Sequence, residues 1–177
     1  MSKIGFTGTQ NVGKTTLVKI LSTLPVFEGY RFSTERSKYL QNLGIPLNTD
    51  STIKGQTIFL AERCSELLYE NIIVDRTILD VIAYSNCAKS ITRTNKALFE
   101  MYSSSFINEY DWIFYVTPDG VAMEDNGVRA LDLEYRTKID IEVKHLLDKY
   151  SSQIKNFGII SGSSEERLKQ ITSYIKM

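Results

Sequence analysis

Four residues near the start of the chain, Gly8, Gly13, Lys14 and Thr15, complete the pattern G-x-x-x-x-G-K-[ST]. In this pattern the glycines let the backbone turn its N–H groups toward a phosphate, the lysine reaches the terminal phosphates, and the hydroxyl binds Mg²⁺. The strand-like run KIGFT precedes the pattern, and TTLVKILSTL after it has apolar residues at helical spacing. This context favours a phosphate-binding loop at a helix N-terminus over an ordinary glycine-rich turn.

The loop predicts a binding site for ATP and Mg²⁺. We expect Lys14 to lie in an open cleft against the terminal phosphates, and we expect Thr15 to be a metal ligand. The residues expected to contact the nucleotide belong to the loop and the start of the helix: Gly8, Thr9, Asn11, Val12, Gly13, Lys14, Thr15 and Thr16.

The adenine of ATP is expected near the turn after the last predicted strand, over residues 161–164. In a doubly wound sheet the loop after a neighbouring strand lies beside the nucleotide, and Gly162 leaves room there for a flat base. The alternative is that Gly162 only precedes a helix cap, because Ser163 and Glu166 have the spacing of a capping box.

A second acid, Asp75, follows the most strand-like run in the middle of the chain, NIIV. At the end of a buried strand its carboxylate would lie beside the loop and hold Mg²⁺ through water or accept a proton from an attacking hydroxyl. Arg76, directly after it, would point a cation at the same cleft. The alternative is that Asp75 caps the next helix and Arg76 is solvated.

Two other kinds of phosphate-loop protein are disfavoured. Motor ATPases usually carry another acid after the strand-end aspartate to activate water, and Arg76 takes that place here. GTPases specify guanine with N-K-x-D, but the run from Asn95 to Leu98 lacks the aspartate and does not follow a strand. Phosphoryl transfer to an acceptor is therefore favoured over hydrolysis or a GTP switch.

A segment of about fifteen residues, TPDGVAMEDNGVRAL, separates the fourth predicted strand from the next helix. Loops of this length are usually functional or mobile. Arg129 and Arg136 would lie two turns apart on one helix face, and we predict that they belong to a lid over residues 118–136 that closes on the phosphates. The alternative for Arg136 is a surface ion pair with Asp132 or Asp140.

Five strand-like runs alternate with helical patterns along the chain. The predicted strands cover residues 3–7, 30–34, 71–75, 111–116 and 156–161, and the predicted helices cover residues 15–24, 35–44, 50–69, 78–88, 95–110, 132–150 and 164–175. This alternation predicts a three-layer α/β fold of the P-loop NTPase type, with a mainly parallel five-stranded sheet and helices on both faces. The ligand would bind at the carboxyl ends of the strands.

Composition sets the scale of the molecule. The chain has 177 residues, 42% of them hydrophobic, with 21 basic and 21 acidic residues. We expect a single domain over residues 1–177, and a neutral chain gives no reason to expect a long nucleic acid or an anionic membrane as its partner. No apolar run reaches the roughly 18 residues of a membrane helix, and there is no secretory leader, so we expect a cytoplasmic protein with Cys64 and Cys87 reduced.

Three motifs together resemble a known family. GTQNVGKTT, VDRTILDVIAY and DNGVRALDLEYR, with a following Asp140, are similar to the AAA_28 group of small P-loop kinases. This group includes the nicotinamide riboside kinase domain of bacterial NAD-salvage regulators and many phage-encoded nucleoside or nucleotide kinases. The resemblance implies a thymidylate-kinase-like fold and ATP-dependent transfer to a nucleoside-like or nucleotide-like acceptor.

The resemblance also implies roles for single residues. Asp75 and Arg76 correspond to the acid and arginine that face the acceptor. Arg129 and Arg136 correspond to lid arginines near the phosphates.

The expected acceptor site adds three residues to Asp75 and Arg76. The resemblance places Asp80 on the family helix behind the acceptor. Glu35 and Arg36 follow the second predicted strand, where riboside kinases also have an acid and an arginine, although their order and spacing differ here.

The leading hypothesis is an ATP- and Mg²⁺-dependent kinase that phosphorylates a nucleoside, a nucleotide or a nucleoside-like small molecule. Its catalytic residues would be Lys14, Asp75, Arg76, Arg129 and Arg136, and its metal ligands Thr15 and Asp75. Two alternatives stay open: a kinase that acts on a modified base or an end of a nucleic acid, and an ATP-binding module without catalysis. The sequence also leaves a homodimer open.

Overall fold

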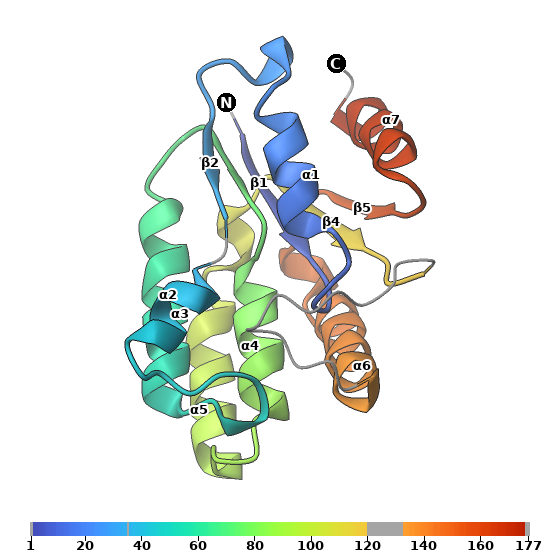
Figure 1. The fold of residues 1–177 in the computed structure, drawn as a ribbon. Coiled ribbons are helices and arrows are strands. Elements are labelled where there is room, and N and C mark those ends of the chain that lie inside the picture. Colours follow the sequence, from blue (N-terminus) through green and yellow to red (C-terminus); the bar gives the residue numbers. More distant parts are fainter. Residues whose placement is uncertain (1, 35, 120–132, 176–177) are drawn as a thin grey trace.

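The computed structural model of the chain describes residues 2–34, 36–119 and 133–175 (Figure 1). In this part of the chain five parallel strands form one sheet in the order β2-β3-β1-β4-β5. The strands are β1 Lys3–Thr7, β2 Arg31–Ser33, β3 Ile72–Val74, β4 Trp112–Val116 and β5 Phe157–Ile160. The predicted five-stranded α/β fold is confirmed, with β1 as its central strand.

Helices connect the strands and cover both faces of the sheet. They are α1 Lys14–Leu21, α2 Ser37–Asn42, α3 Ile53–Glu66, α4 Ile78–Cys87, α5 Arg93–Ser104, α6 Leu133–Lys149 and α7 Ser164–Ile175, with short 3-10 turns at η1 Pro25–Phe27, η2 Asn48–Asp50, η3 Ile107–Glu109 and η4 Ser151–Gln153. Figure 1 shows α1 and α7 on one face and α3, α4, α5 and α6 on the other. Parallel neighbours need such crossover connections, which explains the three layers.

The strand β3 shows why both faces need a cover. Ile73 packs into the hydrophobic cluster under α1 and α7, whereas Ile72 and Val74 pack into the cluster under α3 to α6. All three side chains are at most 2% exposed. A strand between two helical layers must be apolar on both sides, so a continuous apolar run replaces the usual alternation.

Helix boundaries differ from the prediction most in two helices. The helix expected over residues 50–69 begins at Ile53 and ends at Glu66, because Thr52 is its cap: the Thr52 hydroxyl accepts a hydrogen bond from the Gly55 N–H at 3.1 Å. The helix expected over residues 95–110 starts earlier, at Arg93, and ends at Ser104, where a 3-10 turn leads the chain into β4. Caps, rather than apolar spacing, fix these ends.

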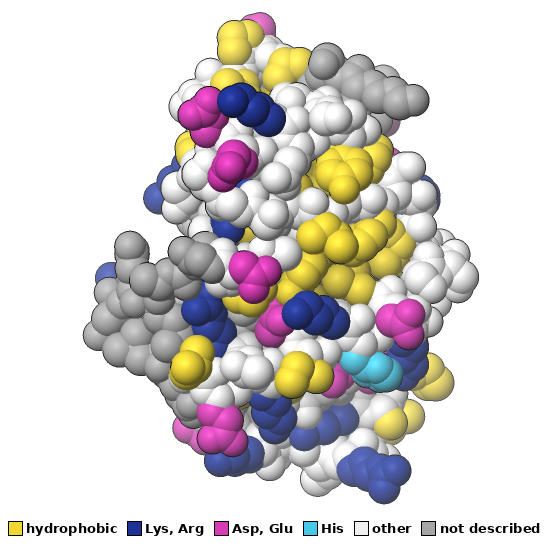
Figure 2. All heavy atoms as spheres, turned by 90° about the vertical axis from the view of Figure 1, so that its right-hand side faces the viewer, with side chains coloured by type: hydrophobic (Ala, Val, Ile, Leu, Met, Phe, Trp, Pro, Cys, Tyr) yellow, Lys and Arg dark blue, Asp and Glu magenta, His cyan; other side chains and the backbone are white. Residues whose placement is uncertain are grey.

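The edge of the sheet leaves apolar side chains at the surface. Figure 2 shows hydrophobic side chains gathered on the face over β5 and α7. Ile160 of β5 is fully buried, whereas Phe157 and Ile159 on its other side are 42% and 52% exposed. The helices therefore leave one face of β5, the last strand of the sheet, partly exposed.

The thiols are consistent with their expected state. Cys64 and Cys87 are both free, and burial raises the pKa of Cys87 to about 11. With this pKa Cys87 stays protonated near neutral pH, so little of its reactive form, the thiolate, is present. Among the helices that the structure describes, none is both long and apolar enough to cross a bilayer.

Candidate active site

The loop predicted from the sequence lies between the end of β1 and the start of α1, at the carboxyl edge of the sheet. Gly13 caps α1 with a φ of 84°, and Gly8 has a φ of 142°. A Cβ atom on Gly8 would lie 2.7 Å from the carbonyl oxygen of Val116 in β4. Gly8 is therefore needed both for its conformation and for the close approach of the neighbouring strand.

Lys14 folds back over the loop. Its ammonium donates hydrogen bonds to the carbonyl oxygens of Gly8 and Thr9, at 2.5 and 2.7 Å, and the residue is 6% exposed. The expectation that Lys14 lies in an open cleft is therefore wrong. The two loop carbonyls attract the ammonium, so Lys14 shapes the loop as well as carrying charge.

Two arginines from the other end of the chain contact the same loop. Arg136 of α6 donates from Nη2 to the carbonyl oxygen of Asn11 at 3.4 Å, and Arg167 of α7 donates from Nη1 to that of Val12 at 2.5 Å. In a trans peptide the C=O and N–H point in opposite directions. Each carbonyl that faces an arginine therefore leaves the N–H of the same peptide, that of Val12 or Gly13, on the opposite side, as an anion site formed by backbone N–H groups would need.

Thr15 and Asp75 meet beside the loop. The Thr15 hydroxyl donates to Asp75 Oδ2 at 2.6 Å, and Asp75 is 1% exposed at the end of β3. Hydroxyl and carboxylate oxygens are the ligands that Mg²⁺ prefers, so this pair fits the predicted metal. No group of three metal-binding acids, histidines or cysteines occurs among the described residues, and Mg²⁺ typically completes its coordination with phosphate oxygens and water.

The alternative role for Asp75, as the cap of the next helix, is wrong. Thr77 caps α4, and the Asp80 carboxylate completes a capping box by accepting from the Thr77 N–H at 2.8 Å. The other oxygen of Asp80 accepts from the Gly8 N–H at 3.1 Å. Asp80 is 0% exposed and connects α4 to the first glycine of the loop. Its observed contacts therefore support the structure of the loop.

Glu66 of α3 adds a partly buried acid whose pKa is influenced by the charge of Asp75. It accepts hydrogen bonds from the Ser33 hydroxyl and from Arg63, the latter at 2.7 Å. Burial raises the pKa of Glu66; the Arg63 charge and the Ser33 hydrogen bond lower it by less, and the Asp75 charge raises it further.

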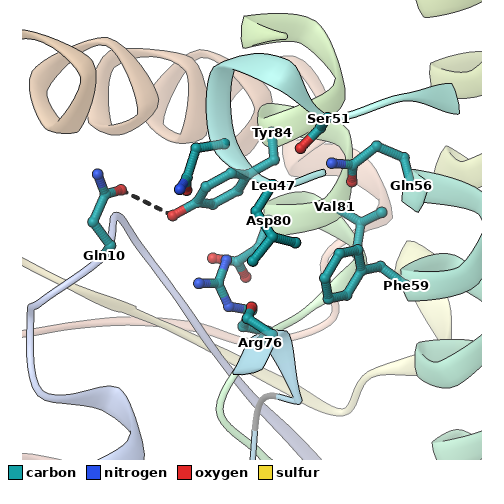
Figure 3. Close-up of a pocket in the computed structure, with 11 residues that line it drawn as sticks. Gln10, Leu47, Ser51, Gln56, Phe59, Arg76, Asp80, Val81 and Tyr84 are labelled. Atoms are coloured by element: carbon teal, nitrogen blue, oxygen red, sulfur yellow. Dashed lines mark hydrogen bonds between the residues drawn. The ribbon is translucent and has the colours of Figure 1, made fainter. Parts of the chain in front are cut away.

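Two pockets meet at the loop. The first, the loop pocket, is lined by residues 10–15 with Asp75 and Arg76. The second, the side pocket, is formed mainly by α3, α4 and the segment before α3, and is lined by Gln10, Ser37, Leu47, Asn48, Ser51, Gln56, Phe59, Arg76, Asp80, Val81 and Tyr84 (Figure 3). Gln10 and Arg76 line both pockets, so a ligand in one would lie next to a ligand in the other.

The two shared residues are held by Tyr84. The Tyr84 hydroxyl donates to Gln10 Oε1 at 2.9 Å, the contact drawn in Figure 3, and the Arg76 guanidinium lies 4.7 Å from the centre of the Tyr84 ring. Stacking on an aromatic ring fixes the plane of a guanidinium.

The remaining predicted residues divide into three groups. Arg136 is only 8% exposed, and Asp140 pairs instead with Lys144 at 2.8 Å, so a surface ion pair between Arg136 and Asp140 is wrong. The alternative pair with Asp132 lies outside the described residues. Arg36 reaches Glu62 at 3.5 Å and does not line the side pocket. The predictions for Glu35, for Arg129 and for the lid between residues 120 and 132 lie outside the described residues.

Gly162 has a local reason to be glycine. Its φ is 84°, and a Cβ atom there would lie 2.4 Å from the Glu166 carboxylate, which accepts from the Ser163 N–H. The helix cap thus explains Gly162, and the adenine site stays a prediction. Arg167 was missed: a basic residue in the first turn of a helix, where acids are favoured, is the signal that points to it.

The fold and the loop define a class of P-loop α/β proteins. The chain belongs to the AAA_28 family, because the model of this family, described as an AAA domain, matches residues 3–167. The resemblance seen in the sequence is thereby confirmed. None of the curated proteins compared with the chain matches it in sequence.

Solved structures share the fold at low identity. Deoxyadenosine kinase from M. mycoides with bound dATP has a TM-score of 0.62 at 17% identity, covering 100% of both chains. NadR protein in complex with NR has a TM-score of 0.74 at 14% identity, covering 98% of this chain and 51% of NadR. YorR protein from Bacillus subtilis, in complex with phosphorylated GDP, has a TM-score of 0.55 at 14% identity, covering 98% of this chain and 95% of YorR.

Proposed function

We propose that the protein is a kinase that transfers the terminal phosphoryl group of ATP, with Mg²⁺, to a nucleoside, a nucleotide or a nucleoside-like small molecule. The observation that carries this proposal is the meeting of two pockets at Gln10 and Arg76. Phosphoryl transfer needs a donor and an acceptor side by side, with charge-stabilising groups between them. The solved relatives, whose bound molecules are nucleotides or NR, support a nucleoside-type acceptor.

The loop pocket is the donor side of this proposal. Inward N–H groups of the loop would bind the β- and γ-phosphates, and Lys14 would exchange its contacts with the loop carbonyls for the phosphate oxygens. Thr15 and Asp75 would hold Mg²⁺, which neutralises charge on the phosphates when bound.

The side pocket is the acceptor side. Its walls combine apolar faces, from Phe59 and Val81, with the side-chain amide of Gln56, which is 2% exposed (Figure 3). A flat ring with hydrogen-bonding edges matches this combination, because the apolar faces cover the ring and the amide pairs with its edge. A nucleoside base has this chemistry.

The reacting groups would lie where the pockets meet. Asp75 lines the loop pocket and is 1% exposed, and its carboxylate would accept the proton of the attacking hydroxyl. Arg76, which lines both pockets, would donate to the phosphoryl group as it passes from donor to acceptor. Positioning and charge account for most of the catalysis of such transfers.

The test is ADP formation by the purified protein with ATP, Mg²⁺ and a panel of nucleosides, nucleotides and oligonucleotides. We expect strong ADP formation with one class of small acceptor, and transfer of label from the γ-phosphate to that acceptor. Lys14→Ala is the matched control and should lower turnover by about 10²- to 10³-fold, the scale for one charge-stabilising donor.

Other outcomes identify other functions. ADP formation that requires an oligonucleotide would indicate a kinase that acts on nucleic acid. ATP binding without turnover on any acceptor would indicate a binding module. Either result contradicts the proposal.

A further inference from the structure

Arg167 contacts the loop from the opposite end of the chain. It lies in the first turn of α7, is 4% exposed, and donates from Nη1 to the carbonyl oxygen of Val12. A Cβ atom on Gly13 would lie 3.2 Å from the same nitrogen, so the guanidinium rests directly against the backbone of the loop. The contact joins residues 155 positions apart in sequence.

The contact fixes one peptide group of the loop. The Val12 carbonyl faces α7, so the N–H of the same peptide, which belongs to Gly13, faces the opposite side. Gly13 lines the loop pocket and begins α1, where unpaired backbone N–H groups and the helix dipole favour an anion. The orientation of this donor therefore depends on Arg167.

The charge of Arg167 is not balanced within the described part of the chain. Its Nε and Nη2 atoms are buried without a hydrogen-bond partner, and no carboxylate of the described residues pairs with the guanidinium. Burial of a cation without a counter-ion costs free energy. A polyphosphate on the other side of the Val12–Gly13 peptide would offset part of that cost.

We propose that Arg167 is a positioning residue of the donor site, which aligns the Gly13 N–H toward a phosphate and supplies buried positive charge behind the loop. This inference rests on the proposed function in one respect, that the loop binds a nucleoside triphosphate. The competing role is a structural one, in which Arg167 only anchors α7 to the domain.

The experiment compares three variants by calorimetric titration with Mg·ATP and Mg·ADP and by thermal unfolding. Arg167→Met keeps the length and the apolar stem but removes the donor and the charge, and Arg167→Lys keeps the charge. Lys169→Met is the matched control, because it removes a cation from the same helix whose partner is the exposed Glu165.

For Arg167→Met we expect the dissociation constants of both nucleotides to rise about tenfold, the scale of one charge-assisted hydrogen bond. Under turnover, KM for ATP should rise while KM for the acceptor stays unchanged. Arg167→Lys should recover part of the affinity, and Lys169→Met should match the parent.

A structural role predicts the reverse pattern. If Arg167→Met unfolds at a lower temperature while its folded fraction binds both nucleotides as tightly as the parent, the inference is wrong. If Arg167→Met does not fold, Arg167→Lys is measured in its place: nucleotide affinity equal to that of the parent, or an equal rise of KM for ATP and for the acceptor, decides against the inference. Failure of the parent itself to bind nucleotide, or equal binding by the parent and Lys14→Ala, would instead remove the proposed function.

Discussion

In the proposed function, Asp75 is the residue on which the chemistry of the site would depend most. It is buried at the end of β3, accepts the Thr15 hydroxyl, and lies beside Arg76 at the junction of the two pockets. Because Thr77 and Asp80 cap α4, the carboxylate of Asp75 is not required to start that helix. In the proposed function this carboxylate would serve metal binding and proton transfer.

Asp75→Asn should lower turnover by about 10²- to 10⁴-fold, since the amide keeps the shape but loses the charge and the proton acceptor. The Mg²⁺ concentration for half-maximal activity should rise. Steady-state kinetics over a range of Mg²⁺ measures both effects. Asp148→Asn, which removes the same charge from the surface of α6, is the control and should be silent.

A structural role for Asp75 would give a different result. The variant would then unfold at a lower temperature while turnover per folded molecule stayed near that of the parent. Measuring the folded fraction by circular dichroism in the assay buffer separates the two cases.

At the scale of single residues, the sequence predicted those that belong to a contiguous motif. Gly8, Lys14 and Thr15 form the loop that their spacing predicts, and Asp75 follows its strand. The details that it did not predict depend on three-dimensional packing. Lys14 turns back onto carbonyls of its own loop, and no local pattern encodes that choice.

Among the elements, α4 is tied most directly to the loop. Its capping box is buried rather than exposed, and Asp80 serves the cap and the Gly8 N–H at the same time. A shift of α4 would therefore move the first glycine of the loop. The helix that forms one wall of the side pocket thus also holds one end of the loop pocket.

Asp80→Ala should destabilise the protein by about 3 kcal/mol, because it leaves the buried N–H groups of Gly8 and Thr77 without their acceptor. It should also raise KM for ATP. Thr92→Ala is the matched control: it removes the exposed cap of α5, which accepts from the Asn95 N–H at 3.3 Å, and should cost about 1 kcal/mol with no change in KM.

Urea unfolding measures the two stabilities, and initial rates at varied ATP measure KM. The assignment of Asp80 as a link fails if Asp80→Ala and Thr92→Ala lose similar stability and both keep the KM of the parent.

At the scale of elements, periodicity predicted the five strands and the order of helices, because each must bury an apolar face. It did not predict how the ends of α6 and α7 reach the loop. Arg136 and Arg167 are single cations in otherwise ordinary helices, and their contacts with Asn11 and Val12 follow from the sheet order. Such contacts can be identified only when the position of each helix in the fold is known.

For the whole molecule, Asp111 joins three strands where they begin. Its side chain accepts from the Lys3 N–H at 2.9 Å and from the Lys155 ammonium at 3.0 Å, and its carbonyl oxygen accepts from Asn156 at 2.8 Å. Burial raises the pKa of Asp111, but the hydrogen bonds from Lys3 and Lys155 outweigh it and hold the pKa below its usual value of 3.8.

A carboxylate with a lowered pKa in the folded state stabilises the protein above its unfolded pKa, and this contribution is lost as the pH falls through the folded pKa. Asp111→Asn should therefore cost about 1 kcal/mol at pH 7, a small value because the pair with Lys155 is half exposed, and the cost should shrink below pH 3.8. Urea unfolding of parent and variant at pH 7 and pH 3 measures this. An equal difference at both pH values would exclude the charge as its cause.

The central position of β1 has a consequence for protein synthesis. A ribosome makes the loop before β3, β4, α6 and α7, yet β1 needs β3 and β4 as neighbours, and the loop needs contacts from α6 and α7. Pairings this distant in sequence form late, since the intervening chain must first emerge and close. The loop is therefore translated before the elements that give it its working shape, and a chain that stalls before residue 112 would carry the complete loop motif without a strand on the β4 side of β1.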